Sequence, residues 1–285
     1  MQPMNLNVKN SENYQLLDSG DGRKLEMFGQ HILDRPCPQA IWPQNPTSPW
    51  GEASAAFSRG TGGSGDWETE KGISDNWPIT LEKLNLEMRL TGFGNVGLFP
   101  EHSCHWDWIS DLLASRKAGA RVLNLFAYTG GASIVCSKVN AKVTHVDAAK
   151  SVNAWAILNA QSSGVPKENI RFLADDASKF VKRELRRSNR YDAIILDPPT
   201  FGRGTKGEVW KVERDLNELI DACFDLLSNR PLFMLVTSHS PGITPTVLEN
   251  LLRKKNGDIE SGEMLISGDG PPLPAGCFAK ILPGK

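Results

Sequence analysis

The 285-residue sequence has little that would place it in a membrane, outside the cell or among zinc proteins. Its five cysteines are scattered and form no Cys-x-x-Cys pair, so neither a zinc cluster nor a disulfide framework is indicated. No apolar run approaches the roughly 20 residues of a membrane span. The first residues, MQPMNLNVKNSENYQ, are polar and contain no signal-peptide core. We therefore predict a cytoplasmic protein that needs no metal and contacts no membrane.

An excess of charge of one sign is also missing. Lys and Arg number 32 against 33 Asp and Glu, which gives a net charge of −1. This excludes a globally basic surface for nucleic acid, although a local basic patch remains possible. Hydrophobic content of 40% and charged content of 23% are typical of a globular chain. The length predicts one large or two modest domains.

Residues 1–93 are predicted to form a small β-rich region. Residues 23–28 and 84–90 alternate apolar and polar side chains, as half-buried strands do. The stretch from 58 to 76 is polar and rich in glycine, which predicts a mobile loop. Four tryptophans lie here, and they either fill the core and pin loops or form a surface that stacks on RNA: Trp42, Trp50, Trp67 and Trp77.

Residues 94–285 are predicted to form a second domain in which strands and helices alternate. Apolar runs typical of buried strands lie at residues 121–126, 142–146, 170–173, 191–196 and 232–237, with helical patterns between them. Such repeats imply an α/β fold with a mainly parallel sheet and right-handed crossovers. Residues 263–266 and 277–281 are predicted to close the sheet as an antiparallel pair. Ligands of such sheets bind beyond the carboxyl ends of the strands.

The stretch RVLNLFAYTGGASIV, residues 121–135, organises this domain. A buried strand breaks at Tyr128-Thr129-Gly130-Gly131 and the chain then resumes as a helix. Glycine lets a backbone approach a ligand closely, and the N–H groups of a helix start point toward that ligand. A strand, a glycine turn and a helix start together predict a nucleotide pocket.

Acidic residues follow the next three strands. Asp147 ends the second strand, Asp175 and Asp176 end the third, and Asp197 ends the fourth. An acid at the second position can accept hydrogen bonds from both ribose hydroxyls. An acid at the third can accept one from an adenine amino group. Because neither GxxxxGK[ST] nor GxGxxG is present, the pattern fits an adenosine without phosphates.

The segment Asp197-Pro198-Pro199-Thr200-Phe201 is the most specific motif of the chain. Each proline fixes φ and removes an N–H, so the chain leaves the strand stiffly. We expect this exit to hold Asp197 beside the cofactor and to project Thr200 and Phe201 over the reaction centre. At the fourth strand of this pattern, the segment points to methyl transfer onto a planar nitrogenous group.

Together these segments resemble the class I S-adenosylmethionine-dependent methyltransferases. The similarity covers about residues 94–255 and is carried by VLNLFAYTGGAS, VTHVDAAKSVNAWAILNAQ, FLADDASKF and DPPTFGRGTKGEVWKVERDLNELI. More narrowly, they resemble the catalytic domain of the bacterial 23S rRNA large-subunit methyltransferases. That group includes a cytosine-C5 enzyme and the guanine-N7 half of a fused enzyme. The resemblance implies a Rossmann-like sheet, S-adenosylmethionine as cofactor and RNA as partner.

The resemblance also implies a set of cofactor-binding residues. They are Phe126, Ala127, Tyr128, Thr129, Gly130, Gly131, Asp147, Ala148, Asp176, Ala177 and Asp197. Asn124 stands where most class I enzymes carry an acid at the first strand end. We therefore expect the cofactor's amino group to rely more on Asp197 or on Glu101, which lies in the preceding segment GLFPEHSCHWDW. The first 90 residues do not resemble the RNA-binding domains of those enzymes.

A catalytic thiol is missing at the place where the cytosine-C5 enzymes carry one. Just after the fifth strand this chain reads Ser238-His239-Ser240. Methylation of cytosine carbon-5 requires a thiolate that adds to carbon-6, so the predicted acceptor is a nitrogen or oxygen. A purine nitrogen fits the closeness of DPPTF to the guanine-N7 enzyme. His239 could accept a proton or orient the base, or it could only cap the strand.

The main prediction is an enzyme that methylates a base nitrogen in RNA, and rRNA is the favoured substrate. The predicted catalytic residues are Asp197, Pro198, Pro199, Thr200, Phe201 and His239. Basic runs at 179–190 and 203–214 either bind RNA phosphates or are ordinary solvated faces. The alternatives are a methyltransferase that acts on a protein or small molecule, an inactive RNA-binding homologue, and an NAD-dependent oxidoreductase, against which the missing GxGxxG argues. Monomer and homodimer both remain open.

Overall fold

The computed structural model describes residues 4–8, 10–60, 64–116, 118–204 and 207–284. The chain divides into two compact units. Unit 1 comprises Met1–Leu6, Cys104–Met264 and Gly276–Lys285, and unit 2 comprises Asn7–Ser103 and Leu265–Ala275. The predicted boundary lies between residues 93 and 94. In the structure unit 2 extends to Ser103, and it gains a second segment because the strands β16 (Gly257–Ile266) and β17 (Leu273–Pro283) are long.

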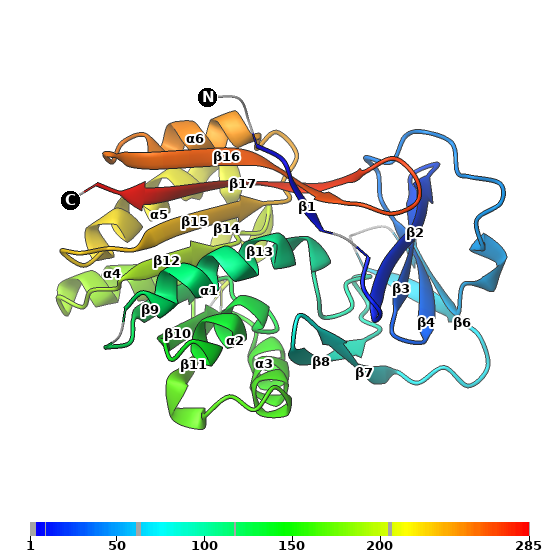
Figure 1. Ribbon diagram of the computed structural model, residues 1–285, viewed down its shortest axis with the longest axis horizontal. Helices are drawn as coiled ribbons and strands as arrows, with labels where there is room; N and C mark the ends of the chain where they lie inside the picture. Colours follow the sequence, from blue (N-terminus) through cyan, green and yellow to red (C-terminus); the bar gives the residue numbers. More distant parts are fainter. Residues whose placement is uncertain (1–3, 9, 61–63, 117, 205–206, 285) are drawn as a thin grey trace. The chain divides into compact units, whose positions relative to one another are not determined.

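Unit 1 is built on a mainly parallel sheet, as predicted (Figure 1). Its parallel strands are β9 (Arg121–Leu125), β10 (Lys142–Asp147), β11 (Ile170–Ala174), β12 (Ala193–Leu196) and β15 (Phe233–Ser238). The strand order is β1-β16-β17-β15-β12-β9-β10-β11, where β1 is Leu6–Val8. The pairs among β9, β10, β11, β12 and β15 are parallel, and β17 pairs antiparallel with β15. This confirms the Rossmann-like class and the closing antiparallel strands.

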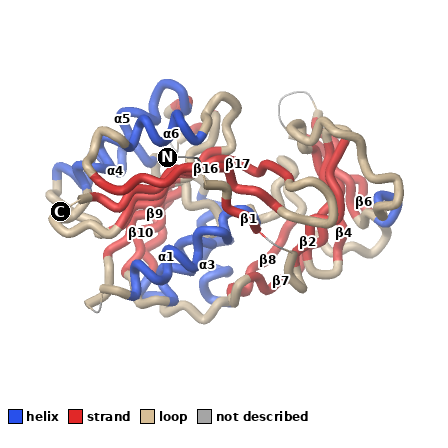
Figure 2. The backbone as a smooth tube through the Cα atoms, turned by 45° about the horizontal axis from the view of Figure 1, so that its top comes forward, coloured by secondary structure: helices blue, strands red, loops and turns tan. Residues whose placement is uncertain are grey.

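Helices cover both faces of this sheet (Figures 1 and 2). On one face lie α1 (Trp106–Ala114), α2 (Gly131–Lys138) and α3 (Lys150–Ser162), and on the other lie α4 (Ala177–Arg186), α5 (Val212–Leu226) and α6 (Pro245–Leu252). Two 3-10 turns, η2 (Pro100–His105) and η3 (Lys167–Asn169), precede α1 and β11. Among the helices that the structure describes, none is both long and apolar enough to span a bilayer.

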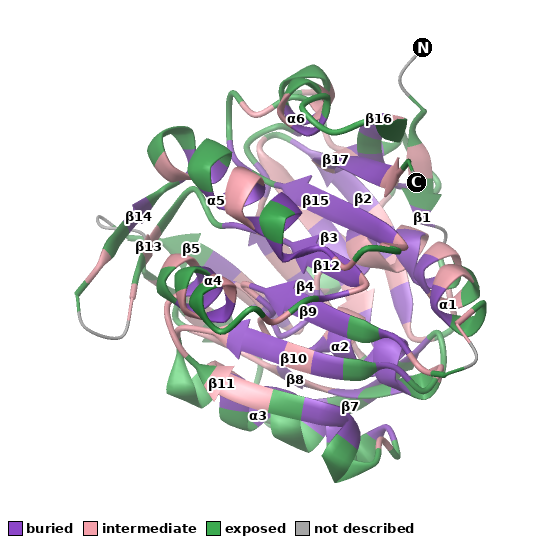
Figure 3. Ribbon diagram, turned by 90° about the vertical axis from the view of Figure 1, so that its left-hand side faces the viewer, coloured by how far each residue is buried: buried purple, intermediate pink, exposed green. Residues whose placement is uncertain are grey.

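The core of unit 1 lies where the central strands are covered on both sides. Every residue of β12 and of β15 is buried (Figure 3). Parallel strands buried on two faces read as continuous apolar runs, which is why the sequence indicated them. On the α4–α6 side the core includes Leu123, Ile194, Ile220, Met234 and Leu248.

Unit 2 is β-rich, as the sequence predicts. Its five-stranded sheet contains β2 (Tyr14–Gly20), β3 (Arg23–Phe28), β4 (His31–Pro36), β5 (Ala55–Arg59) and β6 (Gly65–Thr69), and a separate hairpin contains β7 (Asn76–Leu81) and β8 (Leu84–Arg89). A short turn, η1 (Trp50–Glu52), precedes β5. The predicted glycine-rich loop therefore contains a strand: β6 pairs with β5, and Trp67 packs on Phe57 with ring centroids 5.1 Å apart. Residues 61–63 of that loop lie outside the described part.

The four tryptophans of unit 2 pin its loops and core. Each indole N–H donates to a protein oxygen, at 2.6 to 2.9 Å, and the acceptors are Ser19 O for Trp42, Asp18 Oδ2 for Trp50, Thr91 O for Trp67 and Phe28 O for Trp77. The N–H is the only polar group of an indole, and in a buried indole it usually donates a hydrogen bond. Of the two roles that the sequence leaves open for them, these contacts support filling the core and pinning loops.

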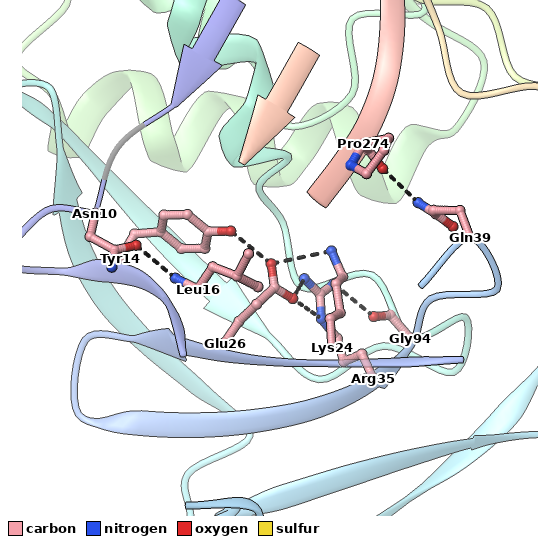
Figure 4. A network of polar contacts seen from close by, with 9 residues as sticks. All are labelled: Asn10, Tyr14, Leu16, Lys24, Glu26, Arg35, Gln39, Gly94 and Pro274. Atoms are coloured by element: carbon pink, nitrogen blue, oxygen red, sulfur yellow. Dashed lines mark hydrogen bonds and ion pairs between the residues drawn. The ribbon is translucent and has the colours of Figure 1, made fainter. Parts of the chain in front are cut away.

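A buried polar network ties β2, β3 and β4 together (Figure 4). Glu26 is fully buried at its centre, and its carboxylate accepts from the Tyr14 hydroxyl at 2.9 Å and from Arg35 Nε at 3.0 Å. Lys24 Nζ lies 3.2 Å from the same carboxylate. Burial alone would raise the pKa of Glu26, but Arg35 and Lys24 outweigh burial and the pKa is lowered.

Candidate active site

The pairing register places the predicted site residues at one edge of the sheet. Leu125 at the end of β9 lies opposite Val146 in β10 and Leu196 in β12, and Leu196 lies opposite Val236 in β15. The residues that follow lie at the same carboxyl edge, and they are Phe126, Asp147, Asp197, Thr237 and, after β11, Asp175. Five strand ends therefore lie at one edge of the sheet, which is where ligands of an open α/β sheet bind.

The turn after β9 has a strained backbone, as turns that closely approach a ligand often do. Phe126 and Tyr128 have positive φ angles of 55° and 49°, and Gly130 has a φ of 93°. A Cβ on Gly130 would lie 3.3 Å from the Cβ of Ala156. Both this close approach and the positive φ therefore favour glycine at position 130. Non-glycine residues adopt positive φ rarely and at a cost, and such strain clusters at functional sites. The turn leads directly into the N-terminus of α2.

Asp147 stabilises this turn and is prepared to accept further hydrogen bonds. Its Oδ2 accepts from the Tyr128 N–H at 3.0 Å, and its Oδ1 accepts from the Ala149 N–H at 2.9 Å. Burial raises the pKa of its carboxyl group, against the effect of these two N–H donors. Each carboxylate oxygen has two lone pairs, so one acceptor site on each oxygen is left. This arrangement fits the two hydroxyls of a ribose.

The two acids after β11 have different roles. Asp175 forms an ion pair with Arg183 and accepts from the Asp176 N–H at 2.9 Å. Asp176 caps α4 through Oδ1, which accepts from the Lys179 N–H at 2.8 Å. Its Oδ2 lies toward Gly204, where an added Cβ would approach it to 2.9 Å. Asp176 is therefore the better candidate to accept from an adenine amino group, with Ala177 next to it as the first residue of α4.

Asn124 is part of an interior network. It is buried, and its Nδ2 donates to Ser133 Oγ at 2.9 Å, while that hydroxyl lies 3.0 Å from His145 Nδ1. Burial lowers the pKa of His145 to about 3, so its ring is neutral at pH 7. The network joins β9, α2 and β10 beneath the turn. Glu101 is buried in η2, within unit 2. The roles of Asn124 and Glu101 toward a cofactor stay predictions.

The Asp-Pro-Pro exit meets the end of β15. Thr237 Oγ1 donates to Asp197 Oδ1 at 2.7 Å, and His239 Nδ1 lies 3.5 Å from the same oxygen. Three residues further along each segment, the hydroxyls of Thr200 and Ser240 lie 2.7 Å apart. The structure thus brings Asp197, Thr200 and His239 together, as predicted. It adds Thr237 and Ser240, for which the sequence carried only the weak signal of lying near a strand end.

A short hairpin follows the two prolines, and no pattern in the sequence predicts it. It contains β13 (Phe201–Arg203) and β14 (Val209–Lys211). Trp210 Nε1 donates to the carbonyl of Pro199 at 2.7 Å, and its ring packs on Phe126 with centroids 4.9 Å apart. The indole thereby joins the glycine turn to the Asp-Pro-Pro segment. Phe201 is half exposed at the start of the hairpin.

Cys277 lies nearer to the site than the sequence indicates. It pairs with Ser238 across β15 and β17, one residue from His239. Its Sγ donates to the Ile243 carbonyl at 3.2 Å, and burial raises the pKa of the thiol to about 12. A thiol is nucleophilic only as the thiolate, so Cys277 is not an activated nucleophile.

A parallel sheet in this order, with a glycine turn after one strand and acids after the next, defines a nucleoside-binding site of the class I methyltransferase kind. The comparison with protein families agrees with this assignment. The family model for S-adenosylmethionine-dependent methyltransferases matches residues 61–260, and the chain belongs to this family. The protein is therefore a methyltransferase that uses S-adenosylmethionine.

Similarity to individual proteins extends over different lengths. The ribosomal RNA large subunit methyltransferase K/L of Shewanella baltica strain OS155 is 33% identical over 172 residues, or 56% of this chain and 23% of that protein. The chain thus spans about a quarter of such relatives. The crystal structure of a SAM-dependent methyltransferase from Agrobacterium tumefaciens is 36% identical, with a TM-score of 0.95 over 100% of this chain and 95% of that one. SMU.776, solved with SAH, shares the fold at 17% identity, with a TM-score of 0.71 over 95% of this chain and 76% of that one.

Proposed function

We propose that this enzyme methylates a base nitrogen in RNA, with ribosomal RNA as the substrate. The main support is the geometry of the Asp-Pro-Pro segment after β12. Thr237 Oγ1 donates to Asp197 Oδ1, and His239 Nδ1 lies 3.5 Å from the same oxygen. The curated relatives that match the methyltransferase segment are named as ribosomal RNA large subunit methyltransferases, and this similarity supports an RNA substrate.

The residues present fit the cofactor, which supplies a methyl group already activated on a sulfonium. In this proposal the turn from Phe126 to Gly131 and Ala148 line the nucleoside, while Asp147 accepts from the ribose hydroxyls. Asp176 and the Ala177 N–H bind the adenine edge. The amino acid end is bound by Asp197, with Asn124 as a further predicted contact.

The remaining groups act on the methyl acceptor. Methyl transfer needs alignment and the exclusion of water more than covalent help. Asp197 orients the acceptor, and Thr237 fixes the carboxylate by its 2.7 Å hydrogen bond. His239 accepts a proton where the acceptor nitrogen carries one. The thiol of Cys277 stays protonated, so the proposal favours nitrogen over cytosine carbon-5.

Mass spectrometry of nucleosides tests the proposal. Ribosomal RNA and transfer RNA from a deletion strain are compared with those of the parent and of strains complemented by wild type or by Asp197→Ala. We expect one N-methylated nucleoside to disappear from rRNA and to return only with the wild type. Identical nucleoside profiles in all strains would refute RNA methylation, and loss of 5-methylcytidine would refute the nitrogen acceptor. Labelling of a protein or metabolite fraction by the purified enzyme would favour the alternative substrates.

A further inference from the structure

The hairpin after the Asp-Pro-Pro segment has two different faces. Cross-strand partners share a face, and the register pairs Phe201 with Lys211, Arg203 with Val209, and Gly202 with Trp210. Trp210 is buried, whereas Phe201, Arg203, Val209 and Lys211 are all exposed. Figure 3 shows the hairpin extending past α5, with most of its surface drawn as exposed. We call these four side chains the outer face of the hairpin.

The inner side of the hairpin is fixed to the site. Trp210 donates to the Pro199 carbonyl and packs on Phe126. The Val212 N–H donates to the Thr200 carbonyl at 3.1 Å, which closes the base of the hairpin. The outer face therefore begins one residue after Thr200 and is positioned by the same segment that holds Asp197.

The outer face also carries two cations, Arg203 and Lys211. Five of the neighbouring basic residues are in ion pairs, whereas Arg186 and Arg190 are exposed and form no ion pair in the described part of the chain; the five pairs are Lys179–Glu208, Lys182–Glu218, Arg183–Asp175, Arg187–Glu184 and Arg214–Asp215. Within the described ranges, no carboxylate lies at ion-pair distance from Arg203 or Lys211. The basic run on α4 is thus partly neutralised, and Arg203 and Lys211 add unpaired positive charge on the hairpin beside the Asp-Pro-Pro segment.

Two large apolar side chains accompany these cations. Phe201 is 52% exposed and Val209 is 42% exposed. Single exposed apolar residues are common, but an aromatic residue that shares one hairpin face with two cations, directly after the Asp-Pro-Pro segment, matches the chemistry of single-stranded nucleic acid. Bases stack on aromatic rings, and Arg and Lys bind the flanking phosphates.

We propose that the outer face binds the single-stranded RNA next to the target base, and this rests on the proposed function. Phe201 stacks on a base that flanks the target, while Arg203 and Lys211 contact backbone phosphates. The target base then reaches Asp197 unpaired, because a stacked duplex base is out of reach. Val209 covers the edge of the stacked base.

Binding of a defined probe tests this surface. A fluorescein-labelled 20-nucleotide single strand of mixed sequence and its blunt duplex are titrated with wild type, F201A, R203Q/K211Q and the control K167Q/K255Q. The control removes two exposed cations that belong to no ion pair within the described ranges, Lys167 in η3 and Lys255 after α6. Affinity for S-adenosylhomocysteine and the melting temperature are measured for every variant and should match the wild type.

The expected losses differ between the two hairpin variants. R203Q/K211Q should weaken single-strand binding about tenfold at 0.15 M salt and reduce the salt slope by about 1.4, since each phosphate contact contributes about 0.7. F201A should weaken binding about tenfold with an unchanged slope, because stacking releases no counterion. Equal affinities in the hairpin variants and the control, or no RNA binding by the wild type, would overturn the inference.

Turnover separates this inference from the proposed function. With rRNA from the deletion strain, R203Q/K211Q should raise KM about tenfold and leave kcat within twofold. If the wild type transfers no methyl group to RNA yet binds the probe through the hairpin, the proposed function fails, and only the assignment of the outer face as an RNA-binding surface remains. If the wild type methylates RNA and both hairpin variants keep its KM, the inference alone fails.

Discussion

Asp147 offers the sharpest test of the cofactor site. Both of its oxygens already accept backbone N–H groups, from Tyr128 and Ala149, and in the described part of the chain it forms no ion pair. Partial burial raises the pKa of the carboxyl. A ribose therefore meets an acceptor that is partly desolvated and already oriented by two N–H groups before the ligand arrives.

The loss of cofactor affinity expected on removing the Asp147 carboxylate can be calculated from the hydrogen bonds that it would make to the ribose. A hydrogen bond to a charged group contributes about 1.5–3 kcal/mol net, and two hydroxyls share the Asp147 carboxylate. Allowing for imperfect additivity, Asp147→Ala should cost about 2–4 kcal/mol of cofactor binding, or roughly 30- to 1,000-fold in affinity. Asp147→Asn keeps the shape and one acceptor, so its loss should be smaller.

Calorimetric titration with S-adenosylhomocysteine at pH 7.5 measures these losses. Asp175→Ala is the matched control, because Asp175 lies at the same edge of the sheet but pairs with Arg183. The control should bind within about threefold of the wild type. If Asp147→Ala also binds within threefold while remaining folded, the assignment of Asp147 to the ribose is wrong.

The pH dependence gives a second readout with a defined sign. Because the pKa of Asp147 is raised, its ionisation costs folding free energy in the absence of ligand. That contribution favours folding at low pH and is lost as pH rises through the folded pKa. Cofactor affinity should change in the opposite sense and fall as pH decreases through a pKa above the ordinary Asp range. Asp147→Asn should remove this step, and a step that persists in Asp147→Asn belongs to another group.

Three further changes have defined outcomes. Asp197→Ala should lose most methyl transfer and keep its melting temperature within a few degrees, and surviving activity would contradict a catalytic role. RNA that contains 5-fluorocytosine, incubated with S-adenosylmethionine, should give no protein–RNA band on a denaturing gel, because Cys277 is held as the thiol; a band would overturn this. Arg35→Met should lower the free energy of unfolding in urea by about 3–5 kcal/mol, since it leaves Glu26 as a buried charge short of a partner. Glu26→Leu with Arg35→Met should recover part of that loss, and no recovery would argue that packing dominates.

The sheet and its ligand edge could be predicted from the sequence because their signals are local. Buried parallel strands are short apolar runs, and the acids that follow them are read directly along the chain. Asp147, Asp176 and Asp197 were placed at one edge in this way, and the register confirms that placement. Because the carboxyl ends of parallel strands lie at one edge of the sheet, residues far apart in the chain could be predicted to lie close together.

The contacts that the sequence did not indicate are those between side chains far apart in the chain. The bond from Thr237 to Asp197 depends on β15 lying beside β12 and on one rotamer. The hairpin consists of two three-residue strands, too short for a periodic pattern. The sequence does not distinguish Trp210 from any other aromatic residue, and its contacts with Pro199 and Phe126 are evident only in the structure.

The proposed site has a cofactor half and an acceptor half whose residues are held in different ways, and this should separate cofactor binding from substrate choice. On the cofactor half, Asp147 and Asp176 each commit oxygens to backbone N–H groups, so their geometry follows from the sheet and from the start of α4. On the acceptor half, positions depend on side-chain hydroxyls and on a hairpin whose Trp210 ring packs on Phe126 of the glycine turn. Substitutions on the outer face should therefore change which RNA is bound without changing cofactor affinity. Substitution of Trp210 should change both, because its ring contacts Phe126 on one half and its N–H contacts Pro199 on the other.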